Sequence, residues 1–182
     1  MQPNEERIDD AEGVAALVAE MARQIADGRR GLAPLRLVGI RTRGLPIAER
    51  LARALGPLVG GVVPVGAVDI TLYRDDLDTG ERWPVLLGTE IPFAVDGSEI
   101  VLVDDVLYTG RTVRAALNAV CDLGRPARVR LAVLIDRGHR ELPIHADVVG
   151  RTIATAAGDR VRVRLSPVDP ADEVVKIIAG RG

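Results

Sequence analysis

The sequence has few of the residue types that build disulfide frameworks, metal sites and aromatic binding platforms. Among 182 residues there are one cysteine and two histidines, and aromatic residues make up 2%. A single cysteine excludes an internal disulfide, and Cys121 with only His139 and His145 beside it disfavours a structural zinc site. Cys121 falls on the apolar side of a helical repeat, so we expect it in the core.

The chain also lacks an excess of charge and long hydrophobic runs. Its 24 basic residues nearly balance 26 acidic residues, so no overall field marks it for nucleic acid, and any basic face must be local. Nothing at the N-terminus resembles a signal peptide, and no apolar run approaches membrane-spanning length. We therefore expect one cytoplasmic domain over residues 1–182 that does not contact a membrane.

The most informative stretch spans residues 100–117 and reads IVLVDDVLYTGRTVRAAL. Its four leading apolar residues predict a strand buried on both faces, which ends at Asp104 and Asp105. A loop over residues 107–112 with one glycine and two threonines then enters a helix, and such a loop offers backbone N–H groups and hydroxyls to a phosphate. Two carboxylates suit ribose hydroxyls instead, or Mg²⁺ held through water. A ribose 5-phosphate therefore fits both halves of the stretch.

Short motifs also arise by chance, and the two acids could merely end a strand while Thr109 caps the helix. The segment VLVDDVLYTGRT argues against this, because it resembles the phosphoribosyl-pyrophosphate (PRPP) loop of type I phosphoribosyltransferases. DITLYRDDL at residues 69–77 and DRGHRELP at residues 136–143 narrow the resemblance to the PyrR family, which comprises bifunctional pyrimidine-operon attenuators and uracil phosphoribosyltransferases. The resemblance covers about residues 10–165.

Alternating strand and helix patterns predict an α/β fold with a central parallel sheet flanked by helices and a ligand site at the carboxyl ends of its strands. A polar tail runs to about Asp9, Asp9 and Glu12 are expected to cap the first helix, and the end of the chain from Ser166 is weakly patterned. Strands are predicted over residues 35–40, 62–73, 100–103, 129–135 and 161–165, and a second helix over residues 46–55.

The resemblance implies the type I phosphoribosyltransferase fold, with a small hood and a flexible lid loop. The core is expected over about residues 10–136 and 158–166, and the hood over about residues 137–157. The lid is expected over about residues 74–92, where charges mix with glycine and proline. A long hairpin is the alternative for the lid, and the two interpretations are compatible.

The loop GIRTRG at residues 39–44 follows a second predicted strand and precedes a helix. Its two guanidinium groups and backbone donors suit a pyrophosphate, although a solvated turn has the same composition. The resemblance favours the pyrophosphate, and the family often carries a non-proline cis peptide in this loop, which the sequence alone does not reveal. The expected pyrophosphate-binding residues are Arg41, Thr42, Arg43 and Gly44.

The resemblance assigns roles to further positions, and we state these roles as expectations. The catalytic residues are Asp104, Asp105, Arg43 and Arg74, and the two acids also hold Mg²⁺ through water or through the ribose hydroxyls. The residues around the 5-phosphate are Val106, Leu107, Tyr108, Thr109, Gly110, Arg111 and Thr112. The base-binding residues are Asp136, Arg137, Val148 and Val149.

The expected reaction joins uracil to PRPP and yields UMP and pyrophosphate, in a homodimer or homotetramer. The resemblance also implies a UMP-responsive attenuator that binds a hairpin in an mRNA leader, with Arg23, Arg140, Arg151 and Thr155 on the RNA face. Because other positions of that face carry Ala19, Glu20, Asp27 and Gly28, RNA binding is expected to be weak or to use an altered face. A phosphoribosyltransferase for another base and a nucleotide-sensing regulator with little turnover are the alternatives.

Overall fold

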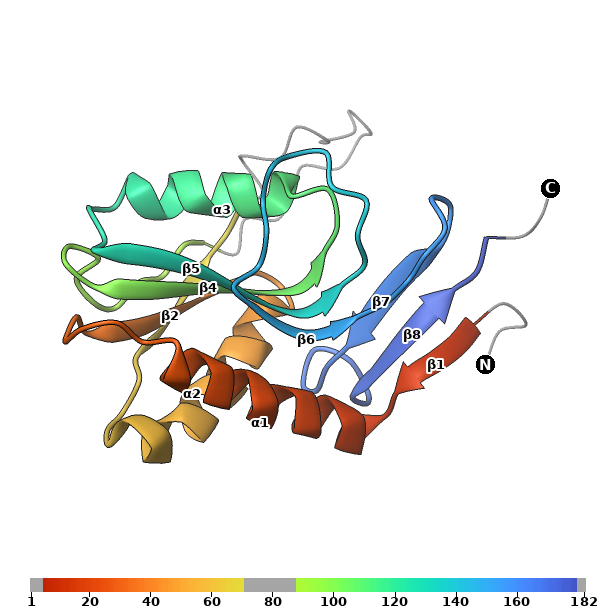
Figure 1. The fold of residues 1–182 in the computed structure, drawn as a ribbon, viewed down its shortest axis with the longest axis horizontal. Coiled ribbons are helices and arrows are strands. Elements are labelled where there is room, and N and C mark those ends of the chain that lie inside the picture. The colour runs from red at the N-terminus through yellow and green to blue at the C-terminus, as the bar shows by residue number, and fades with distance from the viewer. Residues whose placement is uncertain (1–4, 71–87, 180–182) are drawn as a thin grey trace.

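The computed structural model describes residues 5–70 and 88–179. A five-stranded parallel sheet in the order β3-β2-β4-β5-β6 has α1 and α2 on one face and α3 on the other, and a three-stranded antiparallel sheet in the order β1-β8-β7 lies beyond one end of it (Figure 1). The elements are β1 Glu5–Asp9, α1 Ala11–Asp27, β2 Leu35–Ile40, α2 Gly44–Val59, β3 Val65–Val68, β4 Glu99–Leu107, α3 Arg111–Cys121, β5 Arg128–Asp136, β6 Val148–Thr152, β7 Arg160–Arg164 and β8 Glu173–Ile177.

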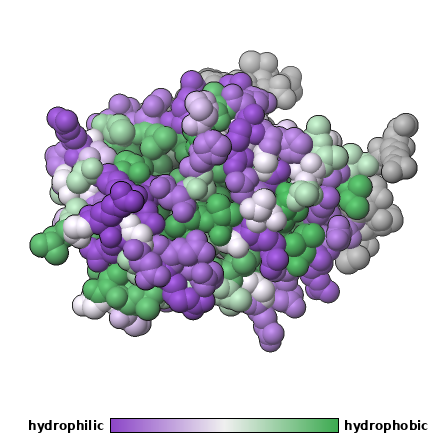
Figure 2. Space-filling model, viewed as in Figure 1, coloured by the Kyte–Doolittle hydropathy of each residue, from purple (hydrophilic) through white to green (hydrophobic). Residues whose placement is uncertain are grey.

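The predicted parallel α/β sheet is confirmed, and its core consists of two apolar layers. Successive residues of β4 alternate between them: Val101 and Val103 pack on the side of α1 and α2, whereas Ile100 and Leu102 pack on the side of α3. This two-sided burial explains the continuous apolar run in the sequence. Hydrophilic residues cover much of the surface drawn in Figure 2, with hydrophobic residues in separate smaller areas. Among the described residues no helix is long and apolar enough to span a membrane.

β4 is longer than the sequence predicts, because it continues through the two acids. Pairing with β5 extends through Asp104, opposite Val133, to Leu107, opposite Asp136. Asp104 and Asp105 therefore belong to the strand instead of following it, and the connection to α3 is only residues 108–110. The neighbouring strand supplies these extra hydrogen bonds, which a sequence pattern does not reveal.

Both ends of the chain form strands that were not predicted. β1 occupies the expected polar tail and pairs with β8, which lies in the weakly patterned C-terminal stretch. The predicted strand 161–165 exists as β7, but it joins this antiparallel sheet and not the parallel one. Residues 148–152, which fall within the expected hood, form β6 at the edge of the central sheet, and the bounds of the hood stay a prediction.

Several local predictions also need correction. The side chain of Asp10, not Asp9, caps α1 by accepting a hydrogen bond from the Gly13 N–H. The second helix begins earlier, at Gly44, and continues to Val59, while the predicted strand 62–73 is reduced to β3 within its described part. Cys121 is exposed, because Val120 takes the inward position and the helix ends one residue later.

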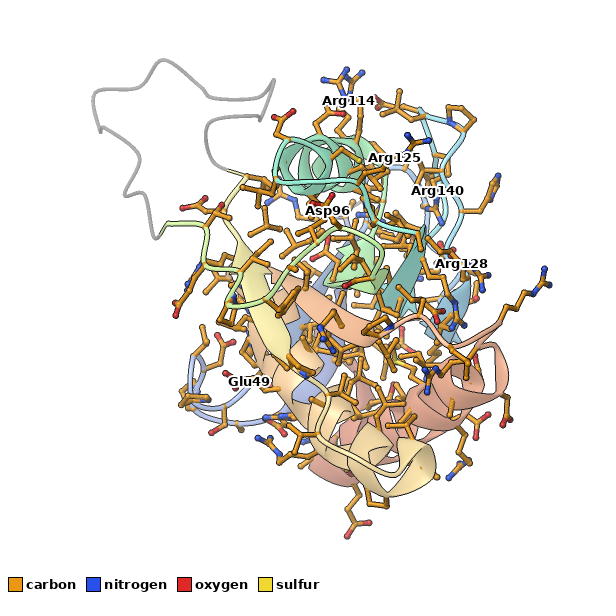
Figure 3. All side chains as sticks on the ribbon, turned by 90° about the vertical axis from the view of Figure 1, so that its left-hand side faces the viewer. Glu49, Asp96, Arg114, Arg125, Arg128 and Arg140 are labelled. Atoms are coloured by element: carbon orange, nitrogen blue, oxygen red, sulfur yellow. The ribbon has the colours of Figure 1, made fainter. Side chains whose placement is uncertain are left out.

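A buried ionic cluster ties the beginning of the sheet to the end of α1. Glu99 is 2% exposed and lies 3.4 Å from the Arg130 guanidinium, 3.8 Å from that of Arg128 and 4.0 Å from that of Arg29. Arg130 also donates to the Ile25 carbonyl at the C-terminal end of α1, where a cation complements the helix dipole. Figure 3 views the molecule from this side and labels Arg128 there.

We expect Glu99→Gln to lower the free energy of unfolding by about 3 kcal/mol, because removing one partner of a buried ion pair leaves the other charge uncompensated. Urea or thermal unfolding measures the change. Glu20→Gln is the matched control, because Glu20 forms an exposed pair with Arg23 on α1, and it should alter stability little. Equal losses in the two variants would contradict a structural role for the buried cluster.

Candidate functional site

The carboxyl ends of β2 and β4 bring two of the predicted loops together. A cavity of about 250 Å³ there is lined by Arg41, Thr42, Arg43, Ile70, Asp104, Asp105, Val106 and Thr112. The loop expected to bind pyrophosphate thus faces the acids expected to bind ribose, as the parallel pairing of β2 with β4 requires.

Glycines allow the β2–α2 loop to lie against β4. A Cβ atom at Gly44 would collide with the Val103 carbonyl oxygen, and one at Gly39 would lie 2.6 Å from the Leu45 nitrogen. Only glycine therefore permits this close approach. The Arg41–Thr42 peptide bond is cis. The Arg41 side chain donates from Nε to the Gly88 carbonyl at 3.0 Å, which ties the loop to the segment after β3.

The two acids differ in exposure. Asp104 is 5% exposed and accepts a hydrogen bond from the Asp105 N–H at 2.9 Å, whereas Asp105 is half-buried and accepts from the Val106 N–H at the same distance. Burial and the neighbouring charge of Asp105 raise the pKa of Asp104 well above its ordinary value. Burial also raises the pKa of Asp105, and the positive charge of Arg43 partly opposes that rise. The site thus concentrates negative charge that a bound cation or sugar hydroxyls would offset.

We predict that Asp104→Asn makes the protein more stable at pH 8. A carboxyl whose pKa is raised in the folded state keeps its proton while the unfolded chain loses it, so wild-type stability falls as pH rises from the ordinary pKa of about 4 through the folded value. The gain in the variant should shrink towards pH 4, where both states hold the proton. Thermal unfolding across this pH range tests the prediction. The exposed Asp122→Asn is the control and should give no comparable pH-dependent gain.

The connection between β4 and α3 is a short turn that leads directly into the helix. Gly110 has a φ of 94° and stands directly before α3, so its left-handed conformation turns the strand into the helix. The Thr109 hydroxyl accepts from the Arg111 N–H at 3.4 Å, and Thr112 lines the cavity. Leu107, in contrast, is buried in the core on the α3 side, so only its backbone faces this connection.

Around the end of β5, two of the expected base-binding residues are held by internal contacts. The Asp136 carboxylate accepts from the Gly138 N–H at 2.9 Å and pairs with Arg140. The guanidinium of Arg137 lies 4.1 Å from the centre of the Tyr108 ring. Arg137 is 7% exposed, and its Nε and Nη2 atoms have no hydrogen-bond partner within the described residues. These buried donors suit the carbonyl oxygens of a base.

Val148 and Val149 do not reach this edge. Val148 pairs with Ala132 in the middle of β5, four residues before Thr152, which pairs with Asp136. Its side chain packs into the core beside α1, and that of Val149 packs on the α3 side. Thr152, opposite Asp136, and Ile153, whose N–H donates to the Asp136 carbonyl at 2.9 Å, occupy the expected level. The sequence motif DVVG at residues 147–150 does not show the register of β6 against β5, so it could not indicate which residues of β6 lie beside Asp136.

The four residues expected to bind RNA all have partners within the protein. Arg23 pairs with Glu20, and Arg151 binds both carboxylate oxygens of Asp9 at 2.8 Å. The Arg140 guanidinium donates to backbone carbonyls of the same loops, including Tyr108 at 2.8 Å, and the Thr155 hydroxyl donates to the Arg137 carbonyl. Their role in RNA binding stays a prediction. Arg74 and most of the expected lid lie outside the described residues.

Comparisons with known proteins identify the class to which the chain belongs. Residues 4–164 match the model of the phosphoribosyl transferase domain, so the chain belongs to this family. Proteins named bifunctional protein PyrR are similar along nearly the whole chain. The one from Pelotomaculum thermopropionicum is 54% identical over 93% of each chain, and the one from Chloroflexus aurantiacus is 53% identical over 94% of each. Within the phosphoribosyltransferases, the chain is therefore a member of the PyrR family.

Solved structures agree on the fold. The hypoxanthine phosphoribosyltransferase of Trypanosoma cruzi is 20% identical, with a TM-score of 0.71 over 96% of this chain and 97% of that chain. The enzyme of the same name from Staphylococcus aureus is 17% identical, with a TM-score of 0.64 over 81% and 77%. The chain thus has the type I phosphoribosyltransferase fold.

Proposed function

We propose that the chain transfers the 5-phosphoribosyl group of PRPP to uracil and releases pyrophosphate. The observation that carries this proposal is the single cavity that the Asp104–Asp105 pair shares with the Arg41–Arg43 loop and Thr112. Sugar-binding acids, pyrophosphate-binding arginines and the edge of a phosphate-binding loop are all needed at one sheet edge for this reaction. Membership of the PyrR family supports uracil as the base.

In this reaction the bond between C1 of the ribose and the pyrophosphate oxygen breaks, and the oxygen keeps the electron pair. A bond from N1 of uracil to C1 forms, and N1 loses its proton to the surrounding water. Positive charge develops on the ribose ring and negative charge on the leaving group. Asp104 and Asp105 orient the ribose and offset its charge, while Arg41 and Arg43 stabilise the pyrophosphate. Arg74 is expected to assist there.

The two acids fit a magnesium ion that is held mainly by the substrate. They are adjacent carboxylates in the cavity, and Mg²⁺ prefers oxygen ligands from one or two carboxylates together with phosphates and water. No group of three or more acidic, histidine or cysteine side chains in the described residues could hold the ion alone. When bound, Mg²⁺ supplies positive charge beside the leaving pyrophosphate.

Arg137 is our candidate for recognising the base. Its unpaired Nε and Nη2 donors are buried beside Tyr108, and uracil presents carbonyl oxygens as acceptors. A site that hydrogen-bonds its ligand in this way discriminates against a base with a different pattern of donors and acceptors. Thr152 and Ile153 replace Val148 and Val149 in this proposal, because they lie level with Asp136.

The base assay tests the proposed reaction. We expect PRPP and Mg²⁺ to yield pyrophosphate with uracil, and much less with orotate, hypoxanthine or adenine. Asp105→Asn should lower kcat/KM on the order of 100-fold without unfolding the protein, because it removes charge aimed at the reacting sugar. Thr112→Ala should lower it less, through loss of one phosphate contact. Equal turnover of a purine would contradict uracil specificity, and unchanged rates in both variants would contradict the site.

We further infer that the chain is an RNA-binding attenuator and that the outer face of the small sheet contributes to RNA binding. Arg7 on β1 and Arg162 on β7 both lie opposite Val175 of β8. Arg160 is two residues before Arg162 in β7, so its side chain is on the same face of the sheet. None of these three arginines forms an ion pair within the described residues, in contrast to Arg23 and Arg151. Unpaired guanidinium groups in a row suit a phosphodiester backbone.

A mobility shift with an mRNA leader hairpin from a pyrimidine operon, with and without UMP, tests this inference. Arg160→Gln with Arg162→Gln should weaken binding and reduce the slope of log affinity against log salt by about 2, or about one per lost phosphate contact. The exposed Arg53→Gln on α2 is the matched control and should leave both unchanged. Binding lost in the control as well would indicate non-specific attraction, and no binding by wild type at any salt would refute the attenuator.

A further inference from the structure

Arg43, the arginine at the start of α2, is held by a carboxylate from the far end of the sequence. Its Nε and Nη2 atoms donate to the two oxygens of Asp169 at 3.0 and 2.9 Å. Such a bidentate pair fixes the plane of a guanidinium as well as its position. The side chains of Arg43 and Asp169 are 34% and 15% exposed, so water competes only partly for the pair.

Asp169 is itself fixed by its own turn. One of its carboxylate oxygens accepts from the Leu165 N–H at 2.9 Å, and its N–H donates to the Leu165 carbonyl at 2.7 Å. Arg43 lowers the pKa of Asp169 through these charge-assisted hydrogen bonds, so the carboxylate stays ionised at neutral pH. The carboxylate therefore offers Arg43 a rigid anchor.

A second pair of the same kind attaches this turn to α2. Arg50 binds Asp172 bidentately at 2.5 and 2.9 Å and also donates to the Ser166 carbonyl at 2.9 Å. Arg43 and Arg50 are seven residues apart, and seven residues are close to two helical turns, so both project from one side of α2 towards the turn. The two pairs resemble each other chemically, but only Arg43 lines the cavity; Arg50 does not.

The pairing leaves donors on Arg43 for a ligand. A guanidinium has five N–H donors, and Asp169 engages two of them. Nη1 makes no hydrogen bond within the described residues. The hydrogen bonds to Asp169 raise the pKa of Arg43, and the negative charge of Asp105 adds to that rise. Arg43 thus lies between an anchoring carboxylate and the acids of the cavity.

We propose that Asp169 is a positioning residue, which acts through Arg43 to hold its free donors towards the pyrophosphate of the substrate. The inference rests on the proposed function, because it names a further residue that serves the same site. Without Asp169, the long arginine side chain would sample several rotamers and would turn towards Asp105. Binding of pyrophosphate would then have to order the Arg43 side chain, and the lost conformational entropy would weaken binding.

The test compares Asp169→Ala with Asp172→Ala. Each variant removes one carboxylate from the same turn, one bidentate arginine pair and one backbone hydrogen bond. We expect Asp169→Ala to lower kcat/KM for PRPP about 10- to 100-fold, since a small misplacement of a positioning group has an effect of that size. KM for uracil should stay within about twofold, and Asp172→Ala should change neither parameter by more than about threefold. Equal losses in the two variants would overturn the proposal.

A double-mutant cycle with Arg43→Ala separates positioning from general damage. If Asp169 acts through Arg43, then Asp169→Ala should have little further effect in the Arg43→Ala background. A full further loss there would overturn the proposal. Calorimetric binding of pyrophosphate with Mg²⁺ gives a readout that does not require turnover of uracil. If the wild-type protein did not act on uracil, but Asp169→Ala weakened pyrophosphate binding and Asp172→Ala did not, the inference would be supported and the proposed reaction refuted.

Discussion

The close approach of α2 to β4 is the constraint on which the site depends. Gly44 begins the helix against the Val103 carbonyl, where any side chain would collide, and Val103 directly precedes the two acids. The parallel pairing of β2 with β4 sets the height of this contact along the sheet. The Arg41–Arg43 loop therefore comes to lie across from Asp104 and Asp105 as a consequence of backbone packing, and no side chain has to draw the two loops together.

The acids themselves oppose folding. A carboxylate buried beside another raises the free energy of the folded state unless a cation or a ligand offsets its charge. The positive charge of Arg43 opposes the rise in the pKa of Asp105, but the Arg43 guanidinium is already paired with Asp169. The negative charge of the two acids is thus only partly compensated by the protein. A ligand that brings a cation and hydroxyl groups would compensate it, and this would contribute to the free energy of binding.

The central sheet could be predicted from the sequence because its signals are local. β2 matches its prediction to the residue, and β5 differs by one residue at each end, since continuous apolar runs between polar loops indicate buried parallel strands. β1 and β8 could not be predicted in this way. They pair Glu5 with Ile177 across nearly the whole chain, and each is a short, charged strand. A long separation in sequence also hides the Arg43–Asp169 pair.

At the site, the residue types indicated which ligands could be bound, but they did not show which arginine side chains are free of internal partners. In a chain whose 24 basic residues are nearly all arginine, phosphate binding is a reasonable expectation at many positions. The structure divides them by their partners: Arg140 donates to loop carbonyls and pairs with Asp136, whereas Nε and Nη2 of Arg137 have no hydrogen-bond partner among the described residues. An arginine with every donor engaged can still shape a site, but it binds a ligand only by giving up an internal contact. Unpaired donors at the carboxyl edge of the sheet, such as those of Arg137, are therefore a better guide to a ligand site than the number of arginines.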